Sequence, residues 1–268
     1  VALSAVHNTA YGYQSLKELT CGDYNTAIGS CSLGKTTTGN KNTASGYAAL
    51  WKNTTGCENT ASGVYALMNN TTGNENTAVG NKALLTNSTG YSNVAVGSSA
   101  LRVNTTGFVN VALGQEALKC NTTAAYNTAT GYAASKCNTT GQANTASGYR
   151  ALADTTTGSF NVSVGSNALR SNTTACNNTA IGYDAMRCNT TGCENVAVGI
   201  AALRDGTATI RNIAIGRSAL CASTGSYNTV VGYIGLSSNT CGQSHAGLGY
   251  AVLYSNTTGC NNSALGNA

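Results

Sequence analysis

The stretch NTASGYAALWKNTTGCENTASGVYALMNNTTGNENTAVG, residues 42–80, decides the fold, because it contains the same 17-residue unit twice and starts a third copy. The unit reads N-T-A-x-G-Y-x-A-L-x-x-N-T-T-G-x-x, and we number its positions 1 to 17. Copies begin at Asn8 and then every 17 residues to Asn212. One residue is then missing before Asn228, and the last two copies begin at His245 and Asn262. We therefore expect one repeat domain over residues 1–268.

The composition favours regular β-structure. Charged residues make up 9% of the chain, the net charge is +5, and there is no proline. Charged residues usually make up about 25% of a globular domain, and a disordered chain of this polarity would carry proline and a high net charge. The absence of proline suits a chain whose backbone N–H groups are all needed for ladder hydrogen bonds.

The length of the repeat selects the kind of fold. Helical-hairpin repeats need more than about 30 residues, whereas 17 residues fit one coil of a β-solenoid with two short strands and two turns. Such coils stack at the strand spacing of about 4.8 Å. The sequence therefore predicts an all-β, parallel β-solenoid (a β-roll) of about sixteen coils with a leucine and alanine core.

Two columns of the repeat carry this prediction. Position 5 is glycine in every copy, which implies either a positive φ or a backbone packed too closely for a Cβ. Position 9 is leucine in nearly every copy, with Met186 and Ser135 as exceptions, and alanines at positions 3 and 8 require a thin coil. We expect the NTTG turn to use asparagine and glycine for left-handed conformations. The glycines are Gly12, Gly29, Gly46, Gly63, Gly80, Gly97, Gly114, Gly131, Gly148, Gly165, Gly182, Gly199, Gly216, Gly232, Gly249 and Gly266. The leucines are Leu16, Leu33, Leu50, Leu67, Leu84, Leu101, Leu118, Leu152, Leu169, Leu203, Leu220, Leu236 and Leu253.

Position 4 predicts a surface for a partner. It is aliphatic in many copies, as in Ile28, Val79, Leu113 and Ile215. If the alanine at position 3 points inward, position 4 points outward. A row of that length exceeds the apolar surface that soluble monomers expose, so we expect identical chains to associate around a common axis. The alternative is the reverse orientation, in which these aliphatic side chains fill a single-chain core.

The run 42–80 resembles the repeats of phage and viral tail-fibre proteins. It is also similar to the β-roll heads of trimeric autotransporter adhesins, which carry related A-x-G-x-x-A patterns. The resemblance covers almost the whole chain and implies a parallel β-roll, trimeric as in the adhesins, that serves as a rigid stalk or receptor-binding head. The resemblance implies no catalytic residue in this chain. The eleven cysteines depart from what such fibres usually carry.

The sequence begins at Val1 and ends within a repeat at Ala268, and we expect neither a signal sequence nor a capping element in it. Solenoids usually need caps at their open β-edges. We therefore expect either a piece of a longer protein or coils that stack head to tail into a filament.

Cysteines recur at equivalent positions of consecutive coils. Cys120 and Cys137 share position 11, and Cys176 and Cys193 share position 16. Stacking brings such Cα atoms to about 5 Å, within disulfide range, so we predict disulfides between coils. The alternative is buried thiols that act as small hydrophobic residues. Disulfides would favour an extracellular location or the surface of a cell or virion, and the absence of a C-x-x-C pair argues against zinc.

The NTT segment creates a column of N-x-S/T sequons. A source that glycosylates such sites would array glycans in a line along the solenoid. The alternative is that asparagine and threonine serve only as turn formers and side-chain ladders. The sequon asparagines are Asn53, Asn70, Asn87, Asn104, Asn121, Asn138, Asn172, Asn189 and Asn256.

Position 10 forms a basic stripe. Stacked like charges repel, so an acidic polysaccharide is a candidate ligand, and a simple solvated face is the alternative. The stripe consists of Arg102, Lys119, Lys136, Arg170, Arg187 and Arg204.

Other functions have weak support. Glycoside cleavage needs a pair of carboxylates, and the best pair, Glu58 and Glu75, lies in a turn with no insertion to form a cleft. Nucleic-acid binding needs a more basic face, no apolar run is long enough to span a bilayer, and no cofactor motif is present. A threonine ladder at position 2 raises ice binding, but valines replace threonine at residues 94 and 111.

The sequence thus predicts a non-catalytic extracellular fibre or filament subunit that associates with itself. The alternative is an adhesin or tail-fibre head that recognises surface polysaccharide. No cofactor, nucleic-acid partner or membrane insertion is expected.

Overall fold

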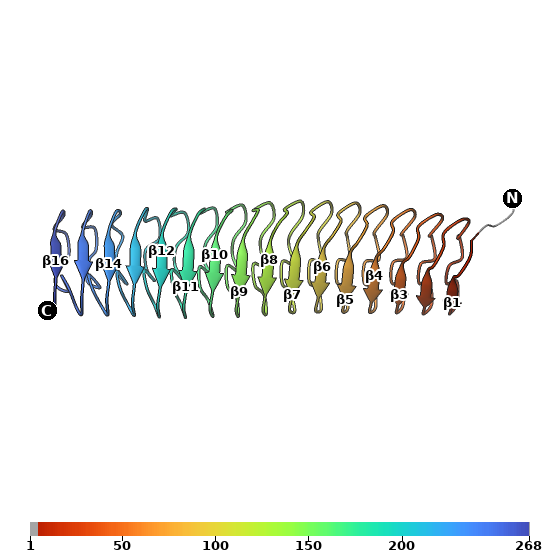
Figure 1. The fold of residues 1–268 in the computed structure, drawn as a ribbon, viewed down its shortest axis with the longest axis horizontal. Coiled ribbons are helices and arrows are strands. Elements are labelled where there is room, and N and C mark those ends of the chain that lie inside the picture. The colour runs from red at the N-terminus through yellow and green to blue at the C-terminus, as the bar shows by residue number, and fades with distance from the viewer. Residues whose placement is uncertain (1–4, 268) are drawn as a thin grey trace. The chain divides into compact units, whose positions relative to one another are not determined.

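The computed structural model describes residues 5–267 and divides the chain into two compact units, Val1–Ala133 and Ala134–Ala268. Both units are built from the same coil, and each coil contributes one three-residue strand (Figure 1). The first unit contains β1 (Thr9–Tyr11), β2 (Thr26–Ile28), β3 (Thr43–Ser45), β4 (Thr60–Ser62), β5 (Thr77–Val79), β6 (Val94–Val96), β7 (Val111–Leu113) and β8 (Thr128–Thr130). The second contains β9 (Thr145–Ser147), β10 (Val162–Val164), β11 (Thr179–Ile181), β12 (Val196–Val198), β13 (Ile213–Ile215), β14 (Thr229–Val231), β15 (Ala246–Leu248) and β16 (Ser263–Leu265).

Within each unit the strands pair in parallel and in register with their neighbours in the chain. Thr43 pairs with Thr60 and Ala44 with Ala61, 17 residues apart, and the same register repeats along the stack. The predicted all-β parallel solenoid is therefore confirmed. No helix in residues 5–267 is long and apolar enough to cross a membrane.

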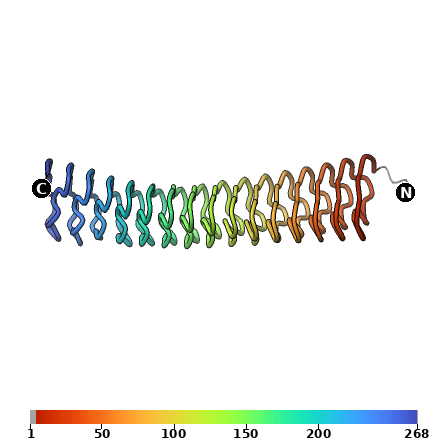
Figure 2. Tube along the Cα trace, turned by 90° about the horizontal axis from the view of Figure 1, so that it is seen from below, coloured from red at the N-terminus to blue at the C-terminus, as the bar shows by residue number. Residues whose placement is uncertain are grey.

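The second strand predicted for each coil is absent from the residues that the structure describes. At positions 7 and 9 the backbone is left-handed, with φ between +48° and +61°. The N–H of Leu50 still donates to the carbonyl of Ala66 in the next coil, over 3.0 Å. The left-handed residues thus interrupt the extended backbone that a strand needs, while backbone hydrogen bonds between the coils continue. Figure 2 shows the backbones of successive coils side by side within each unit.

The core is the predicted column of leucine and alanine. The position 9 leucines from Leu33 to Leu236 are fully buried, as are Met186 and the alanines at positions 3 and 8 of the inner coils. In β11 Ala180 is 0% exposed and Ile181 is 40% exposed. Position 4 therefore points outward, and the alternative in which its aliphatic side chains fill the core is wrong.

The glycine at position 5 meets both requirements that the sequence suggested. Gly97 has φ +131°, and a Cβ there would lie 2.6 Å from the backbone carbonyl of Gly114 in the next coil. The expectation for the NTTG turn was wrong, since neither its asparagine nor its glycine has a positive φ. Gly56 is needed for space instead: a Cβ would lie 2.3 Å from Asn53 Oδ1 and 2.5 Å from the Gly73 carbonyl.

Candidate functional surfaces and the internal asparagine ladders

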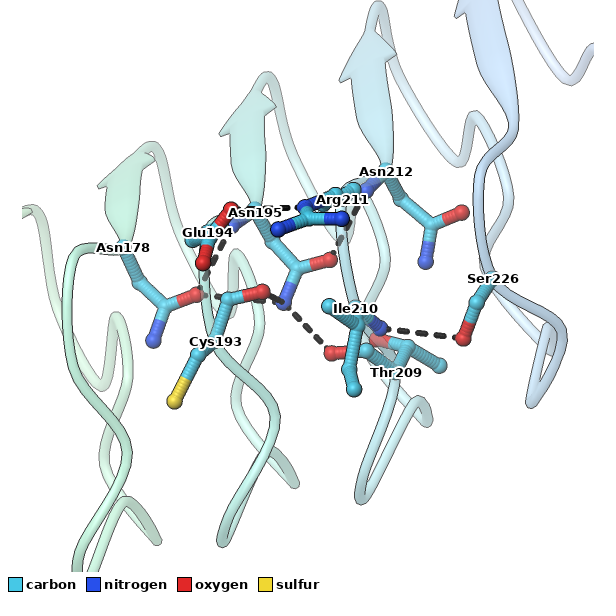
Figure 3. A network of polar contacts seen from close by, with 9 residues as sticks. All are labelled: Asn178, Cys193, Glu194, Asn195, Thr209, Ile210, Arg211, Asn212 and Ser226. Atoms are coloured by element: carbon cyan, nitrogen blue, oxygen red, sulfur yellow. Dashed lines mark hydrogen bonds and ion pairs between the residues drawn. The ribbon is translucent and has the colours of Figure 1, made fainter.

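The asparagine at position 1 forms a ladder inside each unit. Asn195 donates from its backbone N and from Nδ2 to Asn178 Oδ1 in the preceding coil, over 3.0 and 3.1 Å (Figure 3). Its Nδ2 also donates to the Thr209 carbonyl of its own coil over 2.7 Å, and its Oδ1 accepts from the backbone N of Asn212 over 3.0 Å. Each buried amide is thereby satisfied, as buried polar groups require.

The asparagine at position 12 forms a second ladder. Asn70 Nδ2 donates to Asn53 Oδ1 over 2.8 Å and to the Gly73 carbonyl over 2.9 Å. The carbonyl at position 15 accepts from both ladders, as shown by Gly56, which accepts from Asn42 and from Asn53 over 2.8 Å each. The two asparagines of the repeat therefore close each coil from the inside and join it to its neighbours.

These ladders overturn the prediction of a glycan line. Eight of the nine sequon asparagines are fully buried. Asn256 is half-buried, and its Nδ2 donates to the Gly259 carbonyl and to Asn239 Oδ1 over 3.2 Å each. Glycosylation occurs at the nitrogen that these ladders use, and the packed interior leaves no room for a sugar. The alternative interpretation, in which asparagine and threonine form side-chain ladders, is confirmed. The buried sequon asparagines are Asn53, Asn70, Asn87, Asn104, Asn121, Asn138, Asn172 and Asn189.

The predicted disulfides are also absent from the described residues. Cys120, Cys137, Cys176 and Cys193 are thiols, like the other seven cysteines. Cys193 Sγ accepts from the backbone N of Cys176 over 3.2 Å and lies 3.5 Å from the Thr191 carbonyl. Cys176 Sγ likewise accepts from the backbone N of Ser159 over 3.3 Å and lies 3.5 Å from the Thr174 carbonyl.

Position 16 explains Cys176 and Cys193, whereas Cys120 and Cys137 lie at position 11. Short polar side chains there accept a hydrogen bond from the backbone of the preceding coil. Asn74 Oδ1 accepts from Cys57 N over 2.8 Å, and Ser226 Oγ accepts from Ile210 N over 3.1 Å (Figure 3). Cysteine is one of several residues that fill this role. The sequence signal was the alternation of Asn, Ser and Cys at one position, which the disulfide interpretation overlooked.

We expect all eleven cysteines to be alkylated in denaturant without any reductant, because none is in a disulfide. Intact-mass spectrometry after iodoacetamide treatment measures the number of adducts, and a parallel sample that is reduced first is the control. Fewer adducts in the unreduced sample would contradict the structure. In the folded protein we expect slow modification of Cys221, because partial burial raises the pKa of its thiol.

The basic stripe at position 10 is partly neutralised within its own coils. Lys119 Nζ lies 2.7 Å from Glu116, Arg187 lies 3.4 Å from Asp184, and Arg204 lies 2.8 Å from Asp205. The hydrogen bond from Arg204 holds the pKa of Asp205 below its ordinary value. At least three of the six basic residues therefore have a local counter-ion. Binding of an acidic polysaccharide stays a prediction.

The two carboxylates considered for hydrolysis have other partners. Glu58 pairs with Lys41 over 3.0 Å, which raises the pKa of that lysine, and Glu75 accepts from Ser92 Oγ over 2.9 Å. They line a polar hollow of about 360 Å³. A similar exposed pair joins Glu194 and Arg211 over 2.7 Å (Figure 3). In residues 5–267 no group of three or more His, Cys, Asp and Glu side chains is placed to hold a metal ion.

The position 12 ladder is interrupted in several coils, where Leu19, Thr36, Thr155, Gly206 and Ser223 replace the asparagine. In the coil that contains Gly206, Thr209 also replaces the glycine at position 15. Among the described residues, Asn189 Oδ1 and Thr209 Oγ1 are consequently buried without a hydrogen-bond partner. An unpaired buried polar group costs about 1–3 kcal/mol.

We expect the double substitution Gly206→Asn with Thr209→Gly to stabilise the protein by about 1–3 kcal/mol. The new amide would donate to Asn189 Oδ1. The new glycine would remove the contact with the Thr209 side chain, while the 2.9 Å contact of the new Cβ with the Ser223 carbonyl requires a small backbone shift. Thermal and urea unfolding followed by circular dichroism measure the change. Gly206→Asn alone is the control and should gain less, because a Cβ at Gly206 would lie 3.1 Å from the Thr209 side chain. A double variant no more stable than the parent would contradict this account.

The outward face of the strands is uncharged. Its side chains come from positions 2 and 4, and neither position carries Asp, Glu, Lys or Arg in any copy. The face is polar where both positions are threonine or serine, as in β4 and β9. It is mainly aliphatic over β5–β7 in the first unit and over β10–β16 in the second.

Comparison of the chain with protein-family models, with curated proteins and with solved structures finds no match.

Proposed function

We propose that this chain is a non-catalytic structural subunit of an extracellular fibre or filament that associates with further copies of itself. The observation that carries the proposal is the uniform use of the repeat for bonds between coils. The two asparagine ladders and the glycine column recur along both units.

The polar side chains of the repeat serve this bonding. The threonine at position 13 follows the same rule as the asparagines, since Thr54 Oγ1 donates to the Thr71 carbonyl over 3.0 Å. A stack whose units contact only their neighbours gains stability with each added coil. Such a construction suits a load-bearing element and needs no cofactor.

Immunogold electron microscopy of intact cells or virions that carry the protein tests the proposal. Antibodies raised against the recombinant chain should label extended surface structures without permeabilisation. Permeabilised samples provide the control for internal protein. Label that appears only after permeabilisation would contradict an extracellular fibre.

A further inference from the structure

Hydrogen bonds hold the turn of a regular coil to the coil that follows it. In the second unit Thr156, Thr157 and Gly158, at positions 13 to 15, all donate their backbone N–H to one carbonyl. That carbonyl belongs to Thr173 in the next coil and accepts these bonds over 2.9, 3.3 and 3.3 Å. It also accepts from Thr156 Oγ1 over 3.2 Å. Several bonds to one acceptor therefore close this turn against its neighbour.

The turn over residues 206–209 has no such closure. Thr207 and Ala208 occupy positions 13 and 14 of the coil that begins at Asn195, and both are exposed. In the part of the chain that the structure describes, their backbone N–H groups donate no hydrogen bond to the next coil. The turn is therefore open to solvent on that side.

A deletion in the next coil explains the missing bonds. That coil runs from Asn212 to Tyr227 and lacks position 14, so Gly225 follows Thr224 directly. The shortened turn does not bring the Thr224 carbonyl to the N–H groups of the preceding coil, although this is the acceptor that position 13 supplies elsewhere.

The gap is confined to this turn. On one side of it Asp205 N donates to the Cys221 carbonyl over 2.9 Å. On the other side Ile210 N donates to Ser226 Oγ over 3.1 Å (Figure 3). The strands of the two coils, β12 and β13, also remain paired. The turn can therefore open while the coils stay together, and segments with few hydrogen bonds are those that open locally.

The interior side of the turn also favours opening. Gly206 has no side-chain amide for Asn189 Oδ1, and Thr209 Oγ1 is buried without a hydrogen-bond partner among the described residues. Unpaired buried polar groups destabilise the closed form. Opening exposes both oxygens to water, which lowers the free energy needed to lift the turn.

We propose that residues 205–211 form a cleavage site, at which the turn opens locally and an endopeptidase with a pocket for small side chains cuts after Ala208. Water hydrolyses the peptide bond between Ala208 and Thr209, leaving a carboxylate on the first residue and an amino group on the second. Exposed turns of small and polar residues are preferred sites of proteolytic nicking. The two fragments stay associated, because β12 and β13 remain paired. The site does not depend on the proposed fibre function.

Limited digestion of the folded full chain with elastase tests the site, because the specificity pocket of elastase is small. We expect one early cut that yields residues 1–208 and 209–268 in a denaturing gel, identified by mass spectrometry. Size-exclusion chromatography of the same digest should give one peak at the elution volume of the uncut chain. A first cut outside residues 205–211, or no cut there, overturns the proposal. Separation of the fragments on the column would overturn local opening, since it would mean that the coils come apart.

Two variants separate opening from mere exposure. Insertion of a threonine between Thr224 and Gly225 restores position 14 and leaves the cleaved sequence unchanged. Cleavage after Ala208 should then slow at least about tenfold, because restored hydrogen bonds make the open form rarer and cleavage follows its population. Thr157→Ala is the matched control, since it places an exposed alanine at position 14 of a fully bonded turn. Cleavage after residue 157 as fast as after Ala208 would overturn the proposal.

A third variant closes the turn from the inside. Gly206→Asn with Thr209→Gly supplies the missing amide and should also slow cleavage after Ala208, by about fivefold or more. Digestion of each variant in denaturant corrects for the change in sequence beside the cleaved bond. Circular dichroism confirms that each variant is folded. Unchanged cleavage in both the insertion and this double variant would mean that the missing bonds do not control the site.

Discussion

Replacing Gly97 with alanine is expected to unfold the coils around it and to cost roughly 4 kcal/mol or more. Gly97 has φ +131°, a region that L-residues rarely adopt, and the added Cβ would lie 2.6 Å from the Gly114 backbone. Neither the backbone strain nor the steric clash can be relieved locally, because strand pairing holds the neighbouring coil in register. Urea unfolding monitored by circular dichroism measures the loss.

Gly107→Ala is the matched control for that substitution. Gly107 is the position 15 glycine of the same coil and does not have a positive φ. Alanine already occupies position 15 at Ala124 and Ala175. A Cβ at Gly107 would lie 2.4 Å from the Ala124 carbonyl, so the two sites are similarly crowded. Because the backbone at Gly107 is not strained by a positive φ, we expect a smaller loss there, of about 1–3 kcal/mol. Equal losses at Gly97 and Gly107 would show that crowding alone, without backbone conformation, explains the glycine column.

Asn87→Asp is expected to cost about 3–5 kcal/mol at neutral pH, the range for an uncompensated buried charge. The change keeps the shape of the side chain and removes its donors. Asn87 Nδ2 donates to Asn70 Oδ1 and to the Gly90 carbonyl over 2.8 Å each. The variant would place a carboxylate against two acceptors in a buried site.

The pH dependence of this variant has a defined sign. Burial among acceptors raises the folded-state pKa of the new carboxyl above its unfolded value of about 3.9. The variant should therefore be closest to the parent below pH about 4, and the deficit should grow as pH rises toward the folded-state pKa. Asn74→Asp is the control, because Asn74 is exposed and uses only its Oδ1, as an acceptor. A similar loss in both variants, or a deficit independent of pH, would contradict the buried ladder.

The sequence predicted those features that depend on the size of a side chain in a column. Glycine at position 5, leucine at position 9 and the outward aliphatic side chains at position 4 all follow from strict recurrence at one interval. Residues that recur at one interval lie next to one another in the stacked coils. The size and polarity of the side chains in such a column then indicate whether it is buried or exposed.

The features that were mispredicted depend on the path of the backbone within a coil. The NTT segment has the pattern of a sequon and of a turn, and nothing in its letters shows that Asn53 faces the interior. A left-handed leucine such as Leu50 is unexpected because that conformation costs about 1–2 kcal/mol per residue. It persists here because it places a fully buried side chain in the core. The role of cysteine at position 16 likewise required the backbone N–H of the preceding coil to be located.

The asparagine ladders make each unit directional. In both ladders the amide of a later coil donates to the oxygen of the coil before it, as in Asn59 to Asn42 and Asn104 to Asn87. In the position 12 ladder, where only the side-chain amide donates, a coil that lacks its asparagine therefore harms the preceding coil more than the following one. The preceding oxygen loses its donor, while the following amide keeps its bond to the carbonyl of its own coil. Asn189, orphaned by Gly206 in the coil after it, illustrates this asymmetry. The two neighbours of a copy that lacks this asparagine should accordingly differ in how many further substitutions they tolerate, and the preceding copy should tolerate fewer.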